Sequence, residues 1–320
     1  MSDSTAERSI EVGQLQRERW KMEKIEERVA IDKMEEIEKM EEIEKREERI
    51  KGLPKDLQCK VIYSDIDGTL LDSRHHVPER TAMKLRELEV KKIPFILVSA
   101  RMPSAVRLVQ REFCDREAMI CYSGALVLDK EGRELYSHPI PLDLAVEIWA
   151  ALRRDHPKVV RNGYGWDLWV VDDDQDPRVQ REEQITEGKA LVGDMGQIFA
   201  EQGGLHKFLL MGEPEDLGRA ERFLKTRYPQ LSVLRSNAYY LEVMAPGVGK
   251  AEGIRILCGH YGISLEEAAV FGDGENDMGM LRAVGYGIAM GNASDQVKAA
   301  AAYVTLSNEE EGIYEAIKGL

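Results

Sequence analysis

VIYSDIDGTLLDS, residues 61–73, runs from a β-branched apolar segment into three aspartates within eight positions. Residues 61–64 predict a buried strand, and Asp65 and Asp67 then stand where this strand gives way to a loop. Residues i and i+2 of an extended segment point the same way, so the two carboxylates would repel each other. Mg²⁺ would relieve the repulsion, because it binds one or two carboxylates together with water and phosphate oxygens. An acidic turn that leads into a helix cap is the alternative interpretation of this stretch taken alone.

From residue 57 onward, short apolar segments alternate with amphipathic ones. Segments such as PFILVSA (94–100) and AAVFGDG (268–274) predict buried strands, and the stretches between them predict helices. This pattern is typical of the α/β class and predicts a Rossmann-like core, in which a parallel sheet has helices on both faces.

The pattern changes between about residues 140 and 245. Segments such as HKFLLMG (206–212) and AYYLEVM (238–244) predict strands of a separate α+β domain. We therefore predict a core at 57–140 and 246–320 that is interrupted by an inserted cap domain at 141–245. An insertion at the carboxyl ends of the strands would cover the place where open α/β sheets bind ligands.

Residues 1–56 differ from the rest and predict a charged helical extension. They hold 17 acidic and 13 basic residues, and the segment 21–51 is rich in helix formers without proline or glycine. A solvated single helix is one interpretation, and a short coiled coil or partner-binding helix at residues 20–50 is another. The apolar residues Met34, Ile37, Met40 and Ile43 recur every three positions, which does not maintain a heptad seam.

Composition limits the classes of function. The formal net charge of −14 disfavours a nucleic-acid-binding surface. No run of 18 apolar residues predicts a membrane-spanning helix, and the first residues lack the apolar segment of a signal peptide. The four cysteines lack paired spacing, which indicates reduced thiols and predicts a cytoplasmic protein.

A second acidic cluster lies in GDGENDMGML, residues 272–281. Asp273 ends an apolar strand between two glycines, and Asp277 follows four residues later. A calcium loop is disfavoured because the EF-hand glutamate is missing and a strand precedes the loop. Ser99 ends another strand and Lys250 begins a helix, where a hydroxyl and an ammonium group could hold a phosphate. Each of these two residues taken alone is more often an ordinary surface or strand-end residue.

Four segments occur in an order that identifies a resemblance: DIDGTLL (65–71), LVSAR (97–101), GVGK (247–250) and GDGENDMGML (272–281). Together they resemble the signature motifs of haloacid dehalogenase superfamily phosphatases. The long insertion between the second and third motifs resembles the Cof-like branch of that superfamily. The resemblance covers about residues 57–320 and leaves out the N-terminal extension.

The resemblance implies roles for the motif residues. Asp65 would be the nucleophile and a Mg²⁺ ligand, and Asp67 would be the general acid and base that also lends its backbone carbonyl to the metal. Asp273 would complete the protein ligands of the metal, with Asp277 supporting them from behind. The phosphate would be held by Ser99, the amide of Ala100, Lys250 and Asn276.

The predicted function is that of a Mg²⁺-dependent phosphatase of small phosphorylated metabolites, above all sugar phosphates, that works through an aspartyl-phosphate. The alternatives are a phosphomutase acting on a sugar phosphate and a partner-binding protein with a retired catalytic domain. The cap residues Asn162, Trp166, Arg161 and Arg235 are candidates for contacts with the leaving group, and His206 is assigned no role.

Overall fold

The computed structural model describes residues 28, 34, 50 and 57–320. The predicted helical extension, with its alternatives of a coiled coil or partner-binding helix, lies outside the described residues. Residues 57–320 belong to one compact unit that contains two large sheets. Within the described part of the chain, no helix combines the length and the apolar character needed to cross a bilayer.

The first large sheet is the predicted α/β core. Its eight strands follow the order β16-β15-β14-β1-β2-β3-β4-β5. Their bounds are β1 Val61–Ser64, β2 Phe95–Val98, β3 Met119–Cys121, β4 Leu126–Leu128, β5 Glu134–Ser137, β14 Ala268–Gly272, β15 Tyr286–Ala289 and β16 Tyr303–Val304. Every neighbouring pair from β16 to β3 is parallel, which confirms the predicted parallel core sheet.

Strands β4 and β5 extend this sheet in the antiparallel sense, which the sequence analysis did not predict. The chain reverses between them at Asp129, whose carboxylate accepts hydrogen bonds from the backbone N and side chain of Arg133. Gly132 adopts a positive φ of 84° in this turn. A tight turn of this kind allows antiparallel pairing without a crossover helix.

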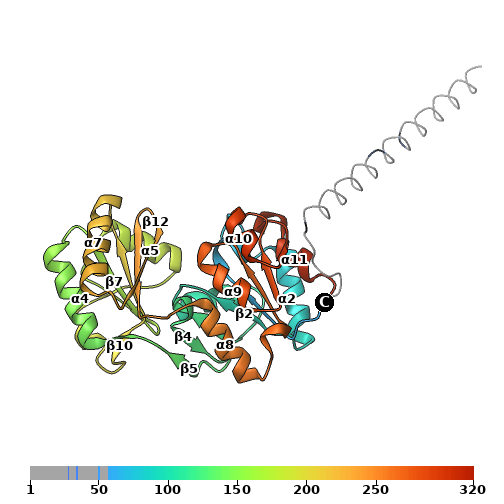
Figure 1. The fold of residues 1–320 in the computed structure, drawn as a ribbon, viewed down its shortest axis with the longest axis horizontal. Helices are drawn as coiled ribbons and strands as arrows, with labels where there is room; N and C mark the ends of the chain where they lie inside the picture. Colours follow the sequence, from blue (N-terminus) through green and yellow to red (C-terminus); the bar gives the residue numbers. More distant parts are fainter. Residues whose placement is uncertain (1–27, 29–33, 35–49, 51–56) are drawn as a thin grey trace, which may run out of the picture. The chain divides into compact units, whose positions relative to one another are not determined.

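Helices cover both faces of the core sheet, because the side chains of its strands alternate between the faces. In β1, Ile62 packs in a cluster with residues of three helices, α2 (Glu79–Val90), α3 (Pro103–Gln110) and α11 (Gly312–Ile317). Val61 and Tyr63 pack in another cluster with residues of α8 (Lys250–Tyr261), α9 (Met278–Ala283) and α10 (Asp295–Ala300). Figure 1 shows α2 and α11 side by side over one face, in agreement with their contacts.

The second large sheet belongs to the inserted region. Its six strands follow the order β12-β13-β11-β7-β8-β9. Their bounds are β7 Val160–Gly165, β8 Leu168–Val171, β9 Leu191–Val192, β11 Lys207–Met211, β12 Ser232–Asn237 and β13 Tyr240–Met244. A small ribbon of β6 (Ile140–Pro141) and β10 (Gly204–Leu205) forms a third, two-stranded sheet. The predicted inserted α+β cap is therefore present as a sheet of its own.

The two faces of this cap sheet have different neighbours. Phe208 and Leu210 of β11 pack in a cluster with α4 (Leu142–Asp155) and α7 (Pro214–Arg227), which Figure 1 shows on the same side of the sheet. Leu209 and Met211 point to the opposite face and join a cluster that includes core residues and Val179 of α5 (Pro177–Thr186). The side chains that share a face with Leu209 are therefore turned toward the core.

Candidate active site

The predicted site residues follow strands that end at the same edge of the core sheet. Asp65 follows β1, Ser99 follows β2 and Asp273 follows β14, and these three strands are parallel neighbours. The carboxyl ends of parallel strands meet at one edge, which brings together groups that are far apart in the sequence. Lys250 reaches the same edge from the first residue of α8.

Lys250 lies between two buried carboxylates. Its Nζ is 2.8 Å from Oδ1 of Asp65 and 2.6 Å from Oδ1 of Asp277. Burial would favour a neutral amine, but the charges of Asp65 and Asp277 outweigh it and raise the pKa of Lys250. Burial raises the pKa of Asp65 to about 7, against the opposing effect of Lys250. The arrangement therefore keeps Lys250 charged beside the Asp65 carboxyl group.

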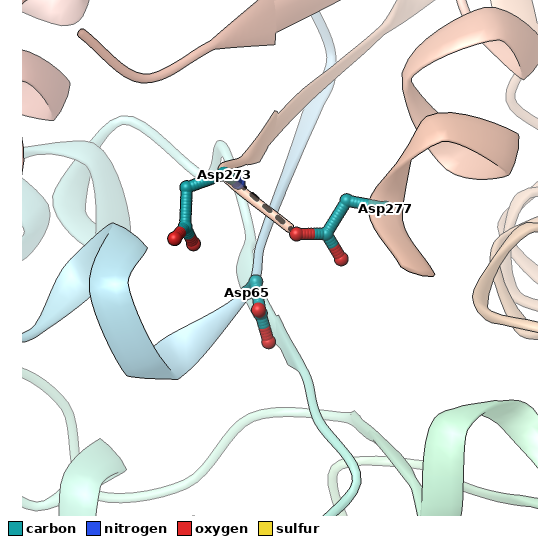
Figure 2. A group of neighbouring side chains, drawn as sticks. All are labelled: Asp65, Asp273 and Asp277. Atoms are coloured by element: carbon teal, nitrogen blue, oxygen red, sulfur yellow. Dashed lines mark hydrogen bonds between the residues drawn. The ribbon is translucent and has the colours of Figure 1, made fainter. Parts of the chain in front are cut away.

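Asp277 is fully buried and binds other groups of the protein. Its Oδ2 accepts hydrogen bonds from the backbone N of Asp273, at 3.0 Å, and of Gly274, at 2.9 Å. Figure 2 shows the first of these bonds as the dashed line between Asp273 and Asp277. A Cβ at Gly272 would lie only 2.6 Å from the Cβ of Asp277, so the loop needs glycine at this position. Asp277 thus holds both Lys250 and the loop that carries Asp273.

Asp65, Asp273 and Asp277 form the acidic group in Figure 2. Each offers one oxygen within 4.8 Å of the others. Burial raises the pKa of Asp273, while the hydroxyl of Thr69, which donates to its Oδ1 at 2.6 Å, opposes that rise. Closely spaced carboxylate oxygens are the donors that a hard divalent cation such as Mg²⁺ prefers. Because Asp277 is occupied by Lys250 and two amides, Asp65 and Asp273 are the side chains best placed to hold a metal.

Asp67 lies apart from this acidic group. Its carboxylate forms a two-point ion pair with Arg101, with Nε of Arg101 3.0 Å from Oδ2, and its side chain is 54% exposed. The chain turns directly after Asp67 at Gly68, which has a φ of 77°, and a Cβ there would lie 2.4 Å from Oδ2 of Asp273. Asp65 and Asp67 nevertheless line the same cavity, with their carboxyl groups held by different cations.

This cavity has a volume of about 420 Å³. From the core it is lined by most of the predicted site residues: Asp65, Asp67, Ala100, Lys250, Asp273 and Asn276. Two predicted residues stand behind this lining. Ser99 is buried and its Oγ accepts a hydrogen bond from the backbone N of Arg101 at 3.2 Å, and Asp277 is held as described above.

The cap closes the other side of the cavity. Lys207 of β11 reaches across and donates a hydrogen bond from Nζ to the carbonyl oxygen of Ala100, at 2.8 Å. Tyr122 of the core donates its hydroxyl hydrogen to the carbonyl oxygen of Trp166 in the cap, at 2.7 Å. Core and cap therefore contact each other directly at the site.

The four cap residues that the sequence suggested for the leaving group do not line this cavity. Asn162 is fully buried and bonds to Trp169 and to the carbonyl of Leu209. Arg161 pairs with Asp172, and Arg235 pairs with Glu221. Trp166 donates from its indole N to Glu134. Each of these side chains has a partner elsewhere in the protein, as an ordinary cap residue would.

Sequence reasoning missed two groups of residues at the site. Arg101 stands in the quoted motif LVSAR, directly after Ala100, and its place after a strand end was a usable signal. Tyr164, Glu182, Lys207 and Glu242 line the cavity from the cap. They come from four separate elements, and nothing in their local sequence distinguishes them.

Comparisons with known proteins agree with this geometry. The model of the haloacid dehalogenase-like hydrolase family matches residues 62–317. A protein of Haemophilus influenzae, provisionally named a phosphatase, is 34% identical over 254 residues, which cover 79% of this chain and 95% of that protein.

Two solved structures extend the comparison. A haloacid dehalogenase-like hydrolase from Bacteroides thetaiotaomicron superposes with a TM-score of 0.75 at 28% identity, covering 81% of this chain and 98% of that one. A sugar phosphatase of subclass IIB of the same superfamily has a TM-score of 0.67 at 27% identity, with coverage of 81% and 98%. The family match spans most of the chain and the motifs meet in one site. The chain therefore belongs to the haloacid dehalogenase-like hydrolases, in their Cof-like branch, and is a phosphatase that acts on phosphoric monoesters.

Proposed function

We propose that this protein is a Mg²⁺-dependent phosphatase of small sugar phosphates that works through an aspartyl-phosphate on Asp65. The observation that carries the proposal is that Asp65, Asp67, Lys250 and Asp273 line one cavity, although they come from three distant segments of the chain. A nucleophilic carboxylate, an acid, a cation and a metal-binding carboxylate are the groups that phosphoryl transfer to an aspartate requires.

In the first step, an oxygen of Asp65 attacks phosphorus and the bond from phosphorus to the leaving oxygen breaks. Lys250, 2.8 Å from Oδ1 of Asp65, orients the carboxylate and offsets the charge on the phosphoryl group. Asp67 gives its proton to the leaving oxygen, so the leaving group departs as an alcohol. Ala100 and Asn276, which line the cavity, are placed to contact the phosphate oxygens, and Ser99 supports the loop that carries Ala100.

In the second step, water attacks the acyl phosphate while Asp67 accepts its proton. Phosphate leaves and the Asp65 carboxylate is regenerated. Asp65 and Asp273, with the backbone carbonyl of Asp67, would hold Mg²⁺. The metal would supply positive charge between the nucleophile and the phosphate. Arg101, paired with Asp67, holds that carboxyl group at the edge of the cavity.

The sugar-phosphate preference is supported by the solved sugar phosphatase that resembles this chain. The cap side of the cavity carries carboxylates rather than a cluster of cations, which disfavours the bisphosphate intermediate of a phosphomutase. We further propose that the functional boundaries are those expected from the sequence: a core of 57–140 and 246–320, and a cap of 141–245. Residues 1–56 would be an accessory extension that hydrolysis does not need.

The test uses the full-length protein and p-nitrophenyl phosphate. We expect phosphate release that is abolished by a chelator and restored by Mg²⁺. A rapid acid quench followed by peptide mapping should place the phosphoryl group on Asp65. Absence of turnover with Mg²⁺ present, or an adduct on another residue, would contradict the proposal.

A further inference from the structure

Tyr164 of β7 places a buried hydroxyl group in the wall of the cavity. The residue is 4% exposed and lines the cavity, but within the described structure its Oη has no hydrogen-bond partner. Its ring is fixed by stacking on Trp169, with ring centroids 5.3 Å apart. A buried hydroxyl normally finds a partner, so a group that enters the cavity is expected to supply it.

Two carboxylates of the cap line the same cavity as Tyr164 and limit the kind of ligand that the cavity can accept. Glu182 of α5 accepts a hydrogen bond from the hydroxyl of Tyr240 at 2.8 Å, and Glu242 of β13 also lines the cavity. Ionised carboxylates only accept hydrogen bonds. A ligand that fits this wall must therefore donate hydrogen bonds, as a hydroxyl group does.

The cations of the cavity are already engaged. Lys250 is paired with Asp65, and Arg101 is paired with Asp67. Lys207 donates to the carbonyl of Ala100 and lies 3.9 Å from Glu242. Among the residues that the structure describes, five acidic and three basic side chains line the cavity, and each of the three basic ones is already paired. A second anionic group on the substrate would therefore meet repulsion.

We propose that Tyr164, Glu182 and Glu242 form a subsite that binds the hydroxyl groups of the leaving group and rejects leaving groups with a second anionic group. The substrate class is thus a polyhydroxylated phosphomonoester whose only anion is the phosphate. This proposal rests on the proposed phosphatase function and adds the basis of its selectivity.

The first test compares matched substrates with the wild-type protein. Sorbitol 6-phosphate and 6-phosphogluconate share a six-carbon open chain, and glycerol 1-phosphate and 3-phosphoglycerate share a three-carbon chain. In each pair only the second compound adds a carboxylate. We expect kcat/KM to be at least about tenfold higher for the polyol ester of each pair.

Equal or higher values for the acids, with p-nitrophenyl phosphate still hydrolysed, would overturn the subsite while leaving the phosphatase function intact. No release from any ester, p-nitrophenyl phosphate included, would instead refute the phosphatase function.

The second test uses conservative variants. Tyr164→Phe should lower the ratio of kcat/KM for sorbitol 6-phosphate to that for p-nitrophenyl phosphate by about tenfold, because the hydroxyl contact is lost. Tyr239→Phe is the matched control, since Tyr239 is 56% exposed and should leave the ratio unchanged. An unchanged ratio in folded Tyr164→Phe would overturn the assignment of Tyr164.

The carboxylates are tested by charge removal. The double variant Glu182→Gln/Glu242→Gln should lower the preference for sorbitol 6-phosphate over 6-phosphogluconate by about tenfold, since the repelling charges are removed. Glu201→Gln, at an exposed cap position, is the control and should keep the preference of the wild type. A preference that survives in the double variant would show that the two carboxylates do not reject anions.

Discussion

The ammonium group of Lys250 lies 2.8 Å from Oδ1 of Asp65, with both side chains enclosed by the protein. The contact joins the start of helix α8 to the end of strand β1, two segments that are 185 residues apart in the sequence. Because Lys250 also contacts Asp277, a single cation links the proposed nucleophile to the loop that presents Asp273.

Replacing the nucleophile should stop turnover. In Asp65→Asn the side-chain amide cannot form an acyl phosphate, so we expect phosphate release to fall by at least about 10³-fold. The measurement is steady-state release from p-nitrophenyl phosphate with Mg²⁺ present, with circular dichroism to check folding. Asp115→Asn, at an exposed position of the core domain, is the control. Activity that persists in Asp65→Asn would require another nucleophile.

Removing the buried cation should cost stability as well as activity. Lys250→Met leaves Asp65 and Asp277 without their partner, and we expect the free energy of unfolding to fall by about 3 kcal/mol. Urea unfolding measures this change. Lys225→Met removes an exposed partner of Glu221 and should change the free energy by less than about 1 kcal/mol.

The same measurement on Lys250→Met/Asp277→Asn tests the coupling. We expect the double variant to lose less than the sum of the two single variants, by about 1 kcal/mol or more, because the second change removes a carboxylate already left unpaired. Strictly additive losses would argue against a shared network.

Asp67 should matter most for leaving groups that need a proton. We expect Asp67→Asn to reduce kcat/KM for an alkyl phosphate such as glycerol 1-phosphate at least about tenfold more than for p-nitrophenyl phosphate, whose phenolate departs without protonation. Parallel assays of both esters give this ratio. An equal loss on the two esters would remove the role of general acid from Asp67.

The burial of His206 leads us to predict how the stability of the folded protein depends on pH. It is buried between core and cap, stacked on Tyr122 with ring centroids 5.2 Å apart, and its Nδ1 accepts a hydrogen bond from the backbone N of Trp166. Burial, with a smaller effect of the charge of His138, lowers the pKa of His206 to about 3 from an ordinary value of 6.5. Between pH 3 and pH 6.5 His206 binds protons more readily in the unfolded chain than in the folded protein. The free energy of unfolding therefore decreases as the pH falls below about 6.5.

The expected loss from pH 7.5 to pH 5 is about 2 kcal/mol from this group. Urea unfolding at the two pH values should show a smaller loss in His206→Gln than in the wild type. His260→Gln, at an exposed position of α8, should retain the loss of the wild type. An identical pH dependence in His206→Gln and the wild type would contradict the assignment.

Much of the core could be predicted from the sequence because its signals are local. Apolar runs such as residues 61–64 form strands wherever both faces are covered, and the residue that follows each run lies at the strand end. This rule placed Asp65 and Asp273 correctly at one edge of a parallel sheet. The antiparallel strands β4 and β5 were not predicted, because each is short and has no distinctive pattern of apolar residues.

The cap residues that line the cavity could not be predicted in the same way. Alternation along β11 shows that Lys207 and Leu209 share a face, but it does not show which face is turned toward the core. Only the register of the cap sheet places Tyr164 opposite Lys207 and Glu242 opposite Leu209 on neighbouring strands. The candidates Arg161 and Asn162 have their side-chain partners within the cap, which their local sequence does not reveal.

By itself the sequence determined the family, the order of the catalytic motifs and the crowding of acids at strand ends, since each of these depends on residues close together in the chain. Only the tertiary structure decided that Lys250 contacts both Asp65 and Asp277, and that Tyr164, Glu182 and Glu242 face the same cavity. The physical reason is that packing and sheet register, rather than neighbouring residues, choose which distant side chains share a buried space.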